Sequence, residues 1–147
     1  MNTTTNTIFD KRKTAIEKKF QQLITKKNEP LSTVGNGIFD RYKNPVVTRN
    51  HAPIEWRYDL NEATNPFFME RIGINATFNA GAMKWGDKYI LAVRVEGVDR
   101  KSFFAIAESP NGVDNFQFWD KPCVIPQTDE PDTNVYDMRL TDRKSVV

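Results

Sequence analysis

The first stretch of the chain carries apolar side chains at the spacing of one helical face. Between residues 8 and 24, Lys and Gln fill many of the remaining positions, and the apolar set includes Phe9, Ile16, Phe20, Leu23 and Ile24. This period predicts an amphipathic α-helix. Asn6 and Thr7 precede it, and both residue types cap helix N-termini. We therefore expect a helix over residues 8–24, within an N-terminal extension that covers residues 1–28.

The pattern changes after Pro30, where turn-forming pairs interrupt short apolar pieces. Asn44-Pro45 and Ala52-Pro53 are two such breaks, and pairs of this kind mark loops. We expect loops and short strands there rather than further helices. The residues from Trp56 to Arg71 then mix polar side chains with aromatic rings. They fit either a loop whose rings pack over the rim of the domain or the wall of a binding cleft.

The clearest structural pattern runs from Phe78 to Trp119. Short β-branched and aromatic runs alternate with turn residues, and no interval between them is long enough for a helix. Such runs predict strands. They end at Trp85, Val95, Ala107 and Trp119. Four consecutive strands joined by tight turns form an antiparallel meander, which is the content of one propeller blade.

A further strand is expected over residues 134–140, so the predicted fold class is all-β with an N-terminal α-helix. One blade and the start of another cannot close a ring, because propeller blades take roughly 40–50 residues each. Residues 29–141 are therefore interpreted as the N-terminal part of a β-propeller domain that is truncated here. Residues 142–147 read Asp-Arg-Lys-Ser-Val-Val, which a common sequencing-adapter DNA encodes in one frame. We expect this tail to be non-native, and a natural polar terminus is the alternative.

Composition and charge exclude several classes of function. The 147 residues suit one domain, and an aromatic content of 12% argues against a disordered segment. A formal net charge of +2 provides no large field to attract nucleic acid. No apolar run reaches the length of a membrane span, and the polar start lacks the apolar core of a signal peptide. We expect a cytoplasmic protein with no nucleic-acid or membrane partner.

Single cysteine and histidine residues limit the available chemistry. Cys123 cannot form a disulfide within the chain, and His51 cannot build a multi-histidine site. A Ser-His-Asp triad would need His51, whose neighbours indicate a loop. The sequence has no phosphate-cradling glycine loop or nucleophile elbow, and neither a metal nor a cofactor is expected. The remaining groups are carboxylates, amides and guanidinium groups among aromatic rings, which are the usual equipment of a carbohydrate site.

Three motifs in order resemble glycoside hydrolase family 130. They run from Arg71 to Ala82, from Val93 to Phe104 and from Asn134 to Leu140. Upstream, Trp-Arg-Tyr-Asp-Leu-Asn at 56–61 and Asn-Pro-Phe at 65–67 resemble the mannosylglucose phosphorylase branch of that family. The resemblance extends over about residues 27–140. It implies that the truncated domain belongs to a five-bladed catalytic propeller with its active site at the central channel.

The resemblance implies an inverting phosphorolysis of β-1,4-mannosyl-glucose to α-mannose 1-phosphate and glucose. Inverting glycosidases use one carboxyl group as an acid and another as a base that activates water. Phosphate is already an anionic nucleophile, so a phosphorylase with phosphate as co-substrate needs only the acid. The family's single catalytic Asp matches Asp137, and the resemblance implies that Asp137 passes its proton through the 3-hydroxyl of the sugar to the glycosidic oxygen. This role requires a protonated Asp137, so a raised pKa in a partly desolvated pocket is expected.

Substrate contacts are expected at six further positions: Asn79, Arg94, Asp99, Arg100, Lys101 and Tyr136. Asn79 matches a family residue that contacts the mannosyl ring, and a turn residue is the alternative. Arg94 points to the same side of its strand as Ile90 and Glu96. It fits either a sugar or phosphate ligand or a buried pair with Glu96. The three consecutive loop residues fit substrate contacts or a charged surface turn, and Tyr136 fits the pocket or the core.

Other functions stay open. The enzyme could act on other β-1,4-mannosides, such as mannooligosaccharides or mannosyl-N-acetylglucosamine. The chain could also be a non-catalytic sugar-binding propeller, or an interaction module that works through its first helix. By resemblance we expect a homo-oligomer, with that helix as a candidate contact. Most phosphate-binding side chains of the family come from later blades, so the chain by itself is expected to be inactive.

Overall fold

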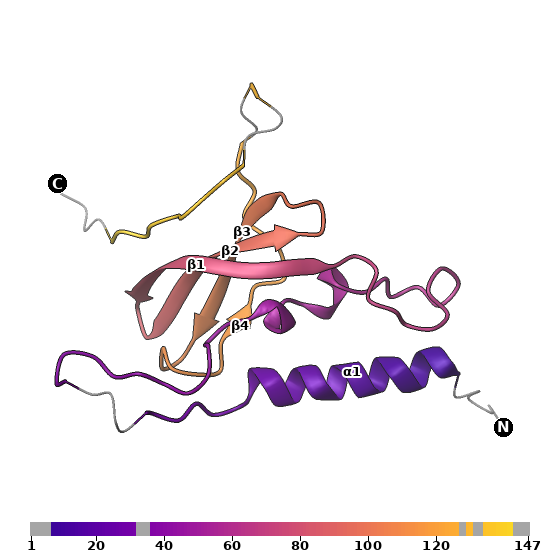
Figure 1. Cartoon of the computed structure of the whole chain (residues 1–147), viewed down its shortest axis with the longest axis horizontal. Helices are drawn as coiled ribbons and strands as arrows, with labels where there is room; N and C mark the ends of the chain where they lie inside the picture. Colours follow the sequence, from indigo (N-terminus) through magenta and orange to yellow (C-terminus); the bar gives the residue numbers. More distant parts are fainter. Residues whose placement is uncertain (1–6, 32–35, 127–128, 131–133, 143–147) are drawn as a thin grey trace.

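The computed structural model describes residues 7–31, 36–126, 129–130 and 134–142 (Figure 1). One α-helix, α1 (Ile8–Ile24), is followed by the single-turn 3₁₀ helices η1 (Arg49–His51) and η2 (Ile54–Trp56). Four strands come next: β1 (Ile74–Trp85), β2 (Lys88–Gly97), β3 (Ser102–Ser109) and β4 (Gln117–Phe118). The described part is therefore mostly sheet with one N-terminal helix, which confirms the predicted class at that level.

The helix α1 has the predicted bounds, and its start is fixed by Thr7. The Thr7 hydroxyl oxygen accepts a hydrogen bond from the Asp10 amide at 3.2 Å, and the Asp10 carboxylate accepts one from the Thr7 amide at 3.3 Å. This reciprocal pair satisfies two amides that an α-helix leaves unpaired at its start. Asn6, the other predicted cap, lies outside the described residues.

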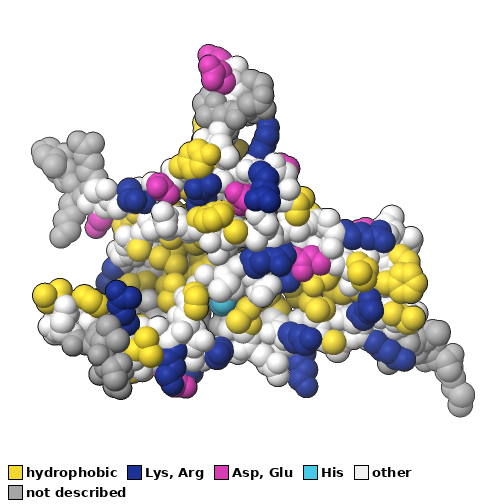
Figure 2. Space-filling model, in the orientation of Figure 1, with side chains coloured by type: hydrophobic (Ala, Val, Ile, Leu, Met, Phe, Trp, Pro, Cys, Tyr) yellow, Lys and Arg dark blue, Asp and Glu magenta, His cyan; other side chains and the backbone are white. Residues whose placement is uncertain are grey.

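Aromatic packing holds the first turn of α1 against the loop that precedes the sheet. Phe9 is only 6% exposed, and its ring meets the Phe68 ring edge-on at 5.1 Å between centroids. Phe68 in turn stacks on Tyr58 at 4.8 Å. The outward face of the helix carries Lys and Arg side chains that lie at the surface of the molecule (Figure 2). The basic excess of the sequence is thus largely a solvated helical face.

The four strands form an antiparallel meander in the order β1-β2-β3-β4, as predicted. β1 begins at Ile74 rather than at Phe78, and β4 is limited to two residues. Two register shifts in the β1–β2 pairing explain why the start of β1 was missed. Asn75 and Asn79 have no pairing partner on β2, because the residues before and after each of them pair with two consecutive residues of β2. Such β-bulges interrupt the alternation of apolar and polar positions by which a strand is recognised.

One face of the sheet carries the core. Val93 and Val95 of β2 are 2% and 0% exposed, and they belong to a buried cluster that also contains Ala52, Ile74, Ala105, Ala107 and Phe116. Trp56 packs over this cluster, with its ring 6.0 Å from that of Phe103 and 5.8 Å from that of Phe118. The loop of η1 and η2 therefore covers this face of the sheet, and α1 lies beyond the loop (Figure 1).

The segment before the sheet differs from its prediction in one respect. Two single-turn helices, η1 and η2, occur where loops and short strands alone were expected, and the described residues of this segment form isolated bridges in place of the expected strands. The Pro53 carbonyl accepts from the Trp56 amide at 3.0 Å in η2, and the η1 turn is closed by a bond from the His51 amide to the Thr48 carbonyl at 2.9 Å. Such turns are too short to impose a helical period on the sequence, so the pattern of apolar positions could not reveal them.

The predicted strand over residues 134–140 is wrong, because this segment contains no strand in the structure. Asp137 has a φ of 45°, in the left-handed region, and this conformation breaks an extended run. The segment also passes across Gly81 rather than along a free edge. A Cβ atom at Gly81 would lie only 2.5 Å from the Met138 carbonyl oxygen. Figure 1 shows this last segment on the side of the sheet away from α1.

No helix among the described residues is long and apolar enough to cross a membrane. Of the tail expected to be non-native, residues 143–147 lie outside the described residues.

Candidate functional site

The face of the sheet away from the core, which we call the open face, brings together three of the predicted site residues: Arg94, Tyr136 and Asp137. Arg94 lies at its centre, directly opposite Phe78 on β1 and Phe104 on β3. The Arg94 guanidinium carbon is 4.7 Å from the centroid of the Phe78 ring and 4.2 Å from that of Tyr136. Such contacts between a cation and an aromatic face are attractive and orient the planar group. The predicted orientation of Arg94, away from the Val93 and Val95 side, is confirmed.

The polar partner of Arg94 is Ser102. Arg94 donates a hydrogen bond from Nε to the Ser102 hydroxyl oxygen at 2.9 Å. The predicted alternative, a pair with Glu96, does not occur, since Glu96 accepts from the Asn75 amide nitrogen and lies 3.7 Å from an Arg100 nitrogen. The bond to Ser102 uses Nε, so within the described part of the chain both terminal nitrogens of Arg94 remain to bind oxygen atoms of a ligand. A planar guanidinium of this kind suits sugar hydroxyls or a phosphate.

Asn134 joins the C-terminal segment to the β2–β3 hairpin. Its side-chain oxygen accepts from the Ser102 amide at 2.8 Å and from the Val135 amide at 3.1 Å. Its side-chain nitrogen donates to the Arg100 carbonyl at 3.4 Å. These bonds place Tyr136, two residues further on, over the Arg94 guanidinium. Tyr136 is 60% exposed, so it belongs to the open face and not to the core.

Asp137, the predicted acid, directly follows Tyr136 on the open face. Its side chain is exposed, and its backbone has a φ of 45°. Asp tolerates this left-handed conformation better than most residues. Residues held in rare conformations gather at functional sites, so the backbone here is compatible with a special role. The desolvated surroundings expected for the acid are not formed by the residues that the structure describes.

Asn79 is the unpaired residue of the second bulge in β1, next to Phe78. Its side chain is exposed. A bulge turns a side chain out of the regular alternation of the strand, and bulges are frequent beside active sites. The predicted alternative, a turn residue, is wrong, because Asn79 lies within a strand.

The residues Asp99, Arg100 and Lys101 form the exposed turn between β2 and β3. The Asp99 carboxylate accepts from the Lys101 amide at 3.0 Å, and the Arg100 amide donates to the Gly97 carbonyl at 3.1 Å. Arg100 has a φ of 66°, and its side chain is 79% exposed. The ion pair of such an exposed side chain with Glu96 contributes little stability. These three residues lie at the end of the hairpin, where both a surface turn and a substrate contact are compatible with their positions.

The polar and aromatic stretch from Trp56 to Arg71 is used for packing. The Arg57 guanidinium binds both carboxylate oxygens of Glu70, at 3.3 and 3.1 Å, and Arg49 binds the same carboxylate at 2.6 Å. Burial acts to raise the pKa of Glu70, but the hydrogen bond and charge of Arg57 and the charge of Arg49 together hold this pKa below its ordinary value. Of the two predicted roles, the packed loop is the one that the structure bears out.

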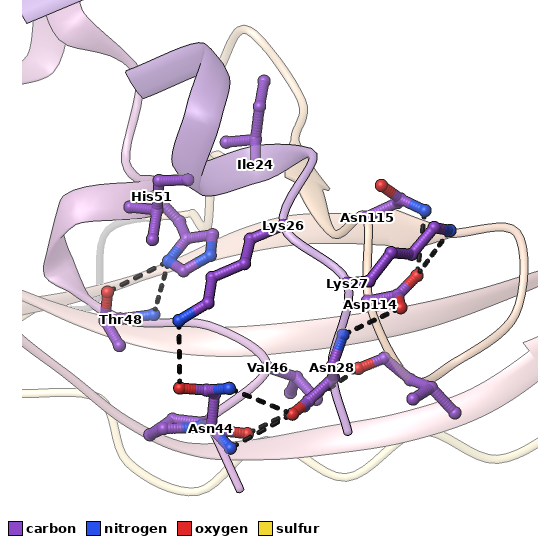
Figure 3. Close-up of a pocket in the computed structure, with 13 residues that line it drawn as sticks. Ile24, Lys26, Lys27, Asn28, Asn44, Val46, Thr48, His51, Asp114 and Asn115 are labelled. Carbon is purple, nitrogen blue, oxygen red and sulfur yellow. Dashed lines mark hydrogen bonds and ion pairs between the residues drawn. The ribbon is translucent and has the colours of Figure 1, made fainter. Parts of the chain in front are cut away.

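A pocket on the opposite side of the molecule lies where the end of α1 meets the loop after β3 (Figure 3). Its polar groups bind one another. The buried Asp114 carboxylate accepts from the Asn28 amide at 3.0 Å and lies 3.2 Å from the Lys27 ammonium. A hydrogen bond from Asn111, joined by those of Asn28 and Lys27, keeps the pKa of Asp114 below its ordinary value. We interpret this network as a structural link between α1 and the sheet.

His51 also borders this pocket (Figure 3). It is buried in η1, and its Nδ1 accepts a hydrogen bond from the Thr48 amide at 3.0 Å. Burial lowers the pKa of His51 below its ordinary value. The predicted loop position is therefore a buried 3₁₀ turn.

Three residues of the open face were not predicted as site residues: Phe78, Ser102 and Asn134. Strand register leads from Arg94 to the first two: Phe78 is directly opposite Arg94 on β1, and Ser102 is opposite Glu96, which makes it a diagonal neighbour of Arg94 on the same face. Asn134 is separated from Ser102 by 32 positions. A local sequence pattern cannot predict a contact between residues so far apart in the sequence.

Comparison with known proteins supports the predicted resemblance. Over 121 residues, or 82% of its length, the chain is 64% identical to the 4-O-beta-D-mannosyl-D-glucose phosphorylase of Bacteroides fragilis. The aligned part covers 31% of that protein, so the chain spans about a third of its relative's length. No protein-family model matches the chain. The resemblance is confirmed in this form: over most of its length, the chain is a close sequence relative of a mannosylglucose phosphorylase.

Proposed function

We propose that the complete protein to which this chain belongs catalyses the phosphorolysis of β-1,4-mannosyl-glucose to α-mannose 1-phosphate and glucose. The observation that carries this proposal is the 64% identity over 121 residues to a mannosylglucose phosphorylase. The chain spans 31% of that relative, so the activity is proposed for the complete protein and not for these residues alone.

The meander of β1 to β4 is proposed to be one blade of a β-propeller, within a catalytic domain that includes residues 29–141. Two features support this assignment. The four strands follow one another in both sequence and space, which is the arrangement of a propeller blade. The open face of the sheet carries polar and aromatic side chains that a neighbouring blade or a ligand would cover.

In the proposed reaction, a phosphate oxygen attacks the anomeric carbon of the mannosyl unit from the face opposite the glucose. The bond between that carbon and the glycosidic oxygen breaks, and its electron pair stays on the oxygen. Asp137 supplies the proton that this oxygen takes up, by way of the sugar's 3-hydroxyl, and becomes a carboxylate. Attack from the opposite face inverts the β-linkage to the α-phosphate, and the anionic nucleophile makes a general base unnecessary.

Arg94 is proposed to bind the substrate on the open face. Its guanidinium is oriented by Phe78 and Tyr136 and by the bond to Ser102, which leaves its terminal nitrogens for sugar hydroxyls or phosphate oxygens. An oriented guanidinium loses little freedom when it binds, so its hydrogen bonds contribute more to affinity. Asn79 and the turn of residues 99–101 are proposed as further contacts.

The test is an assay of the protein encoded by the complete reading frame that contains this sequence. With mannosyl-glucose and inorganic phosphate, it is expected to form α-mannose 1-phosphate and glucose in equal amounts, and to form neither without phosphate. Release of free mannose in the absence of phosphate would identify a hydrolase instead. Binding of the disaccharide with no turnover would identify a sugar-binding propeller.

A further inference from the structure

The segment that carries Asp137 depends on side-chain contacts for its position. Residues 134–142 form no strand, so the segment lacks the ladder of backbone bonds that holds a strand in its sheet. The Asn134 side chain ties the segment to the β2–β3 hairpin by hydrogen bonds to the Ser102 amide at 2.8 Å and to the Arg100 carbonyl at 3.4 Å. Ser102 is the same residue whose hydroxyl oxygen accepts from Arg94.

Two further contacts flank Asp137 on either side. Before it, the Tyr136 ring lies 4.2 Å from the Arg94 guanidinium carbon. After it, the backbone of residues 138–140 passes so close to Gly81 that a Cβ atom there would be 2.5 Å from the Met138 oxygen. Asp137 therefore lies between two contacts by which the segment packs on the sheet. Its left-handed backbone accommodates the bend between them.

We propose that Asn134 is a positioning residue that fixes the location of Asp137 relative to Arg94. This inference rests on the proposed function, since it assigns a role within the same site. The Asn134 side chain sets where the segment leaves the β2–β3 hairpin, and Ser102 couples that point to the Arg94 guanidinium. A proton donor displaced by about 1 Å can lose about 100-fold in rate, so the bonds of Asn134 matter for catalysis although this residue does not touch the substrate.

The experiment compares Asn134→Ala and Asn134→Asp in the protein from the complete reading frame. Alanine removes all of the side-chain bonds, whereas aspartate keeps the oxygen that accepts from the Ser102 and Val135 amides. We expect Asn134→Ala to lower kcat about 10- to 100-fold, while KM for the disaccharide and for phosphate changes less than about threefold. Asn134→Asp is expected to recover most of kcat. Asn44→Ala, which removes amide bonds on the far side of the molecule, serves as the matched control and is expected to keep kcat.

A second measurement follows the segment itself by hydrogen–deuterium exchange. Asn134→Ala is expected to speed exchange in residues 135–142 and at the Ser102 amide, which loses its acceptor, and to leave β2 and the rest of β3 unchanged. Equal losses in binding and turnover, no recovery by aspartate, or unchanged exchange in the segment would overturn the positioning role. If the wild-type protein performs no phosphorolysis, the proposed function fails, and the exchange result alone then decides whether Asn134 holds the segment.

Discussion

The two faces of strand β2 show how one stretch of sequence serves stability and chemistry at once. Val93 and Val95 point into the core, where apolar groups surround them and exposure falls to 2% and 0%. Between them, Arg94 points to the other side, where it contacts the rings of Phe78 and Tyr136. The first face is held by burial of apolar surface, which needs no specific partner geometry. The second is held by directed contacts, which also create a place for a ligand.

On the core face of β2, the substitution Val95→Asp is expected to have the largest effect on stability. The carboxylate would replace a fully buried side chain within a cluster of apolar residues, and an unpaired buried charge costs more than about 3 kcal/mol. Since whole domains are stable by only about 5–15 kcal/mol, most of the folded population is expected to be lost. Denaturant unfolding followed by circular dichroism measures this loss. Val98→Asp is the matched control, because Val98 is 68% exposed in the hairpin turn and its stability change should stay within about 0.5 kcal/mol.

Arg94→Ala, one position away, is expected to affect activity instead. Loss of an oriented charged donor typically lowers turnover about 100-fold. The cost in stability should be about 1 kcal/mol or less, because the contacts with Phe78 and Tyr136 are partly exposed. Steady-state phosphorolysis kinetics and thermal unfolding of the same preparation separate the two effects. If Arg94→Ala unfolded the protein as Val95→Asp does, the open face would be structural and the contrast would disappear.

Much of the fold was predictable because helices and strands depend on the spacing of apolar residues along short stretches of sequence. The helix over residues 8–24 is amphipathic and begins after a capping residue, and the strands are runs of β-branched and aromatic residues with turns between them. The orientation of Arg94 followed from the alternation along β2. The start of β1 was hidden by bulges at Asn75 and Asn79.

The site was predictable only in part, because its geometry depends on contacts between distant residues. Residues 134–140 look like a strand by composition, yet Asp137 takes a left-handed backbone and the segment crosses the sheet at Gly81. Sequence period cannot reveal such a crossing, and Asn134 acquires its partners only through it. Glu96 was expected as a possible partner of Arg94. In the structure, the strand register and the bulge at Asn75 bring the Asn75 side-chain nitrogen within hydrogen-bonding distance of the Glu96 carboxylate instead.

A smaller effect is expected on the core side from Glu70→Gln. The substitution removes the charge that pairs with Arg57 and Arg49, and disruption of such a partly buried network costs about 1 kcal/mol. Because the pKa of Glu70 is lowered in the folded state, its contribution is complete above pH of about 4.5 and is lost as the pH falls through the folded-state pKa. Urea unfolding at pH 7 and pH 4 should therefore differ less in the variant than in the wild type. An equal pH dependence in both would contradict this role.

The smallest effect is expected at His51. Burial lowers its pKa, so the unfolded chain binds the proton more readily than the folded one. Its contribution to stability is thus complete above the ordinary pKa of about 6.5 and decreases as the pH falls below that value. Thermal unfolding between pH 7.5 and pH 5 should show a slope that His51→Gln reduces. A slope that the substitution leaves unchanged would assign the pH dependence to other groups.

The central claim is that the open face carries the proton donor, and Asp137→Asn tests it most directly. Asn tolerates the left-handed backbone of this position equally well and keeps the shape of the side chain, but it cannot donate the acidic proton. In the protein from the complete reading frame, formation of α-mannose 1-phosphate is expected to fall at least about 100-fold while the thermal unfolding midpoint stays unchanged. Retention of activity by a folded Asp137→Asn protein would contradict the account and place the acid elsewhere.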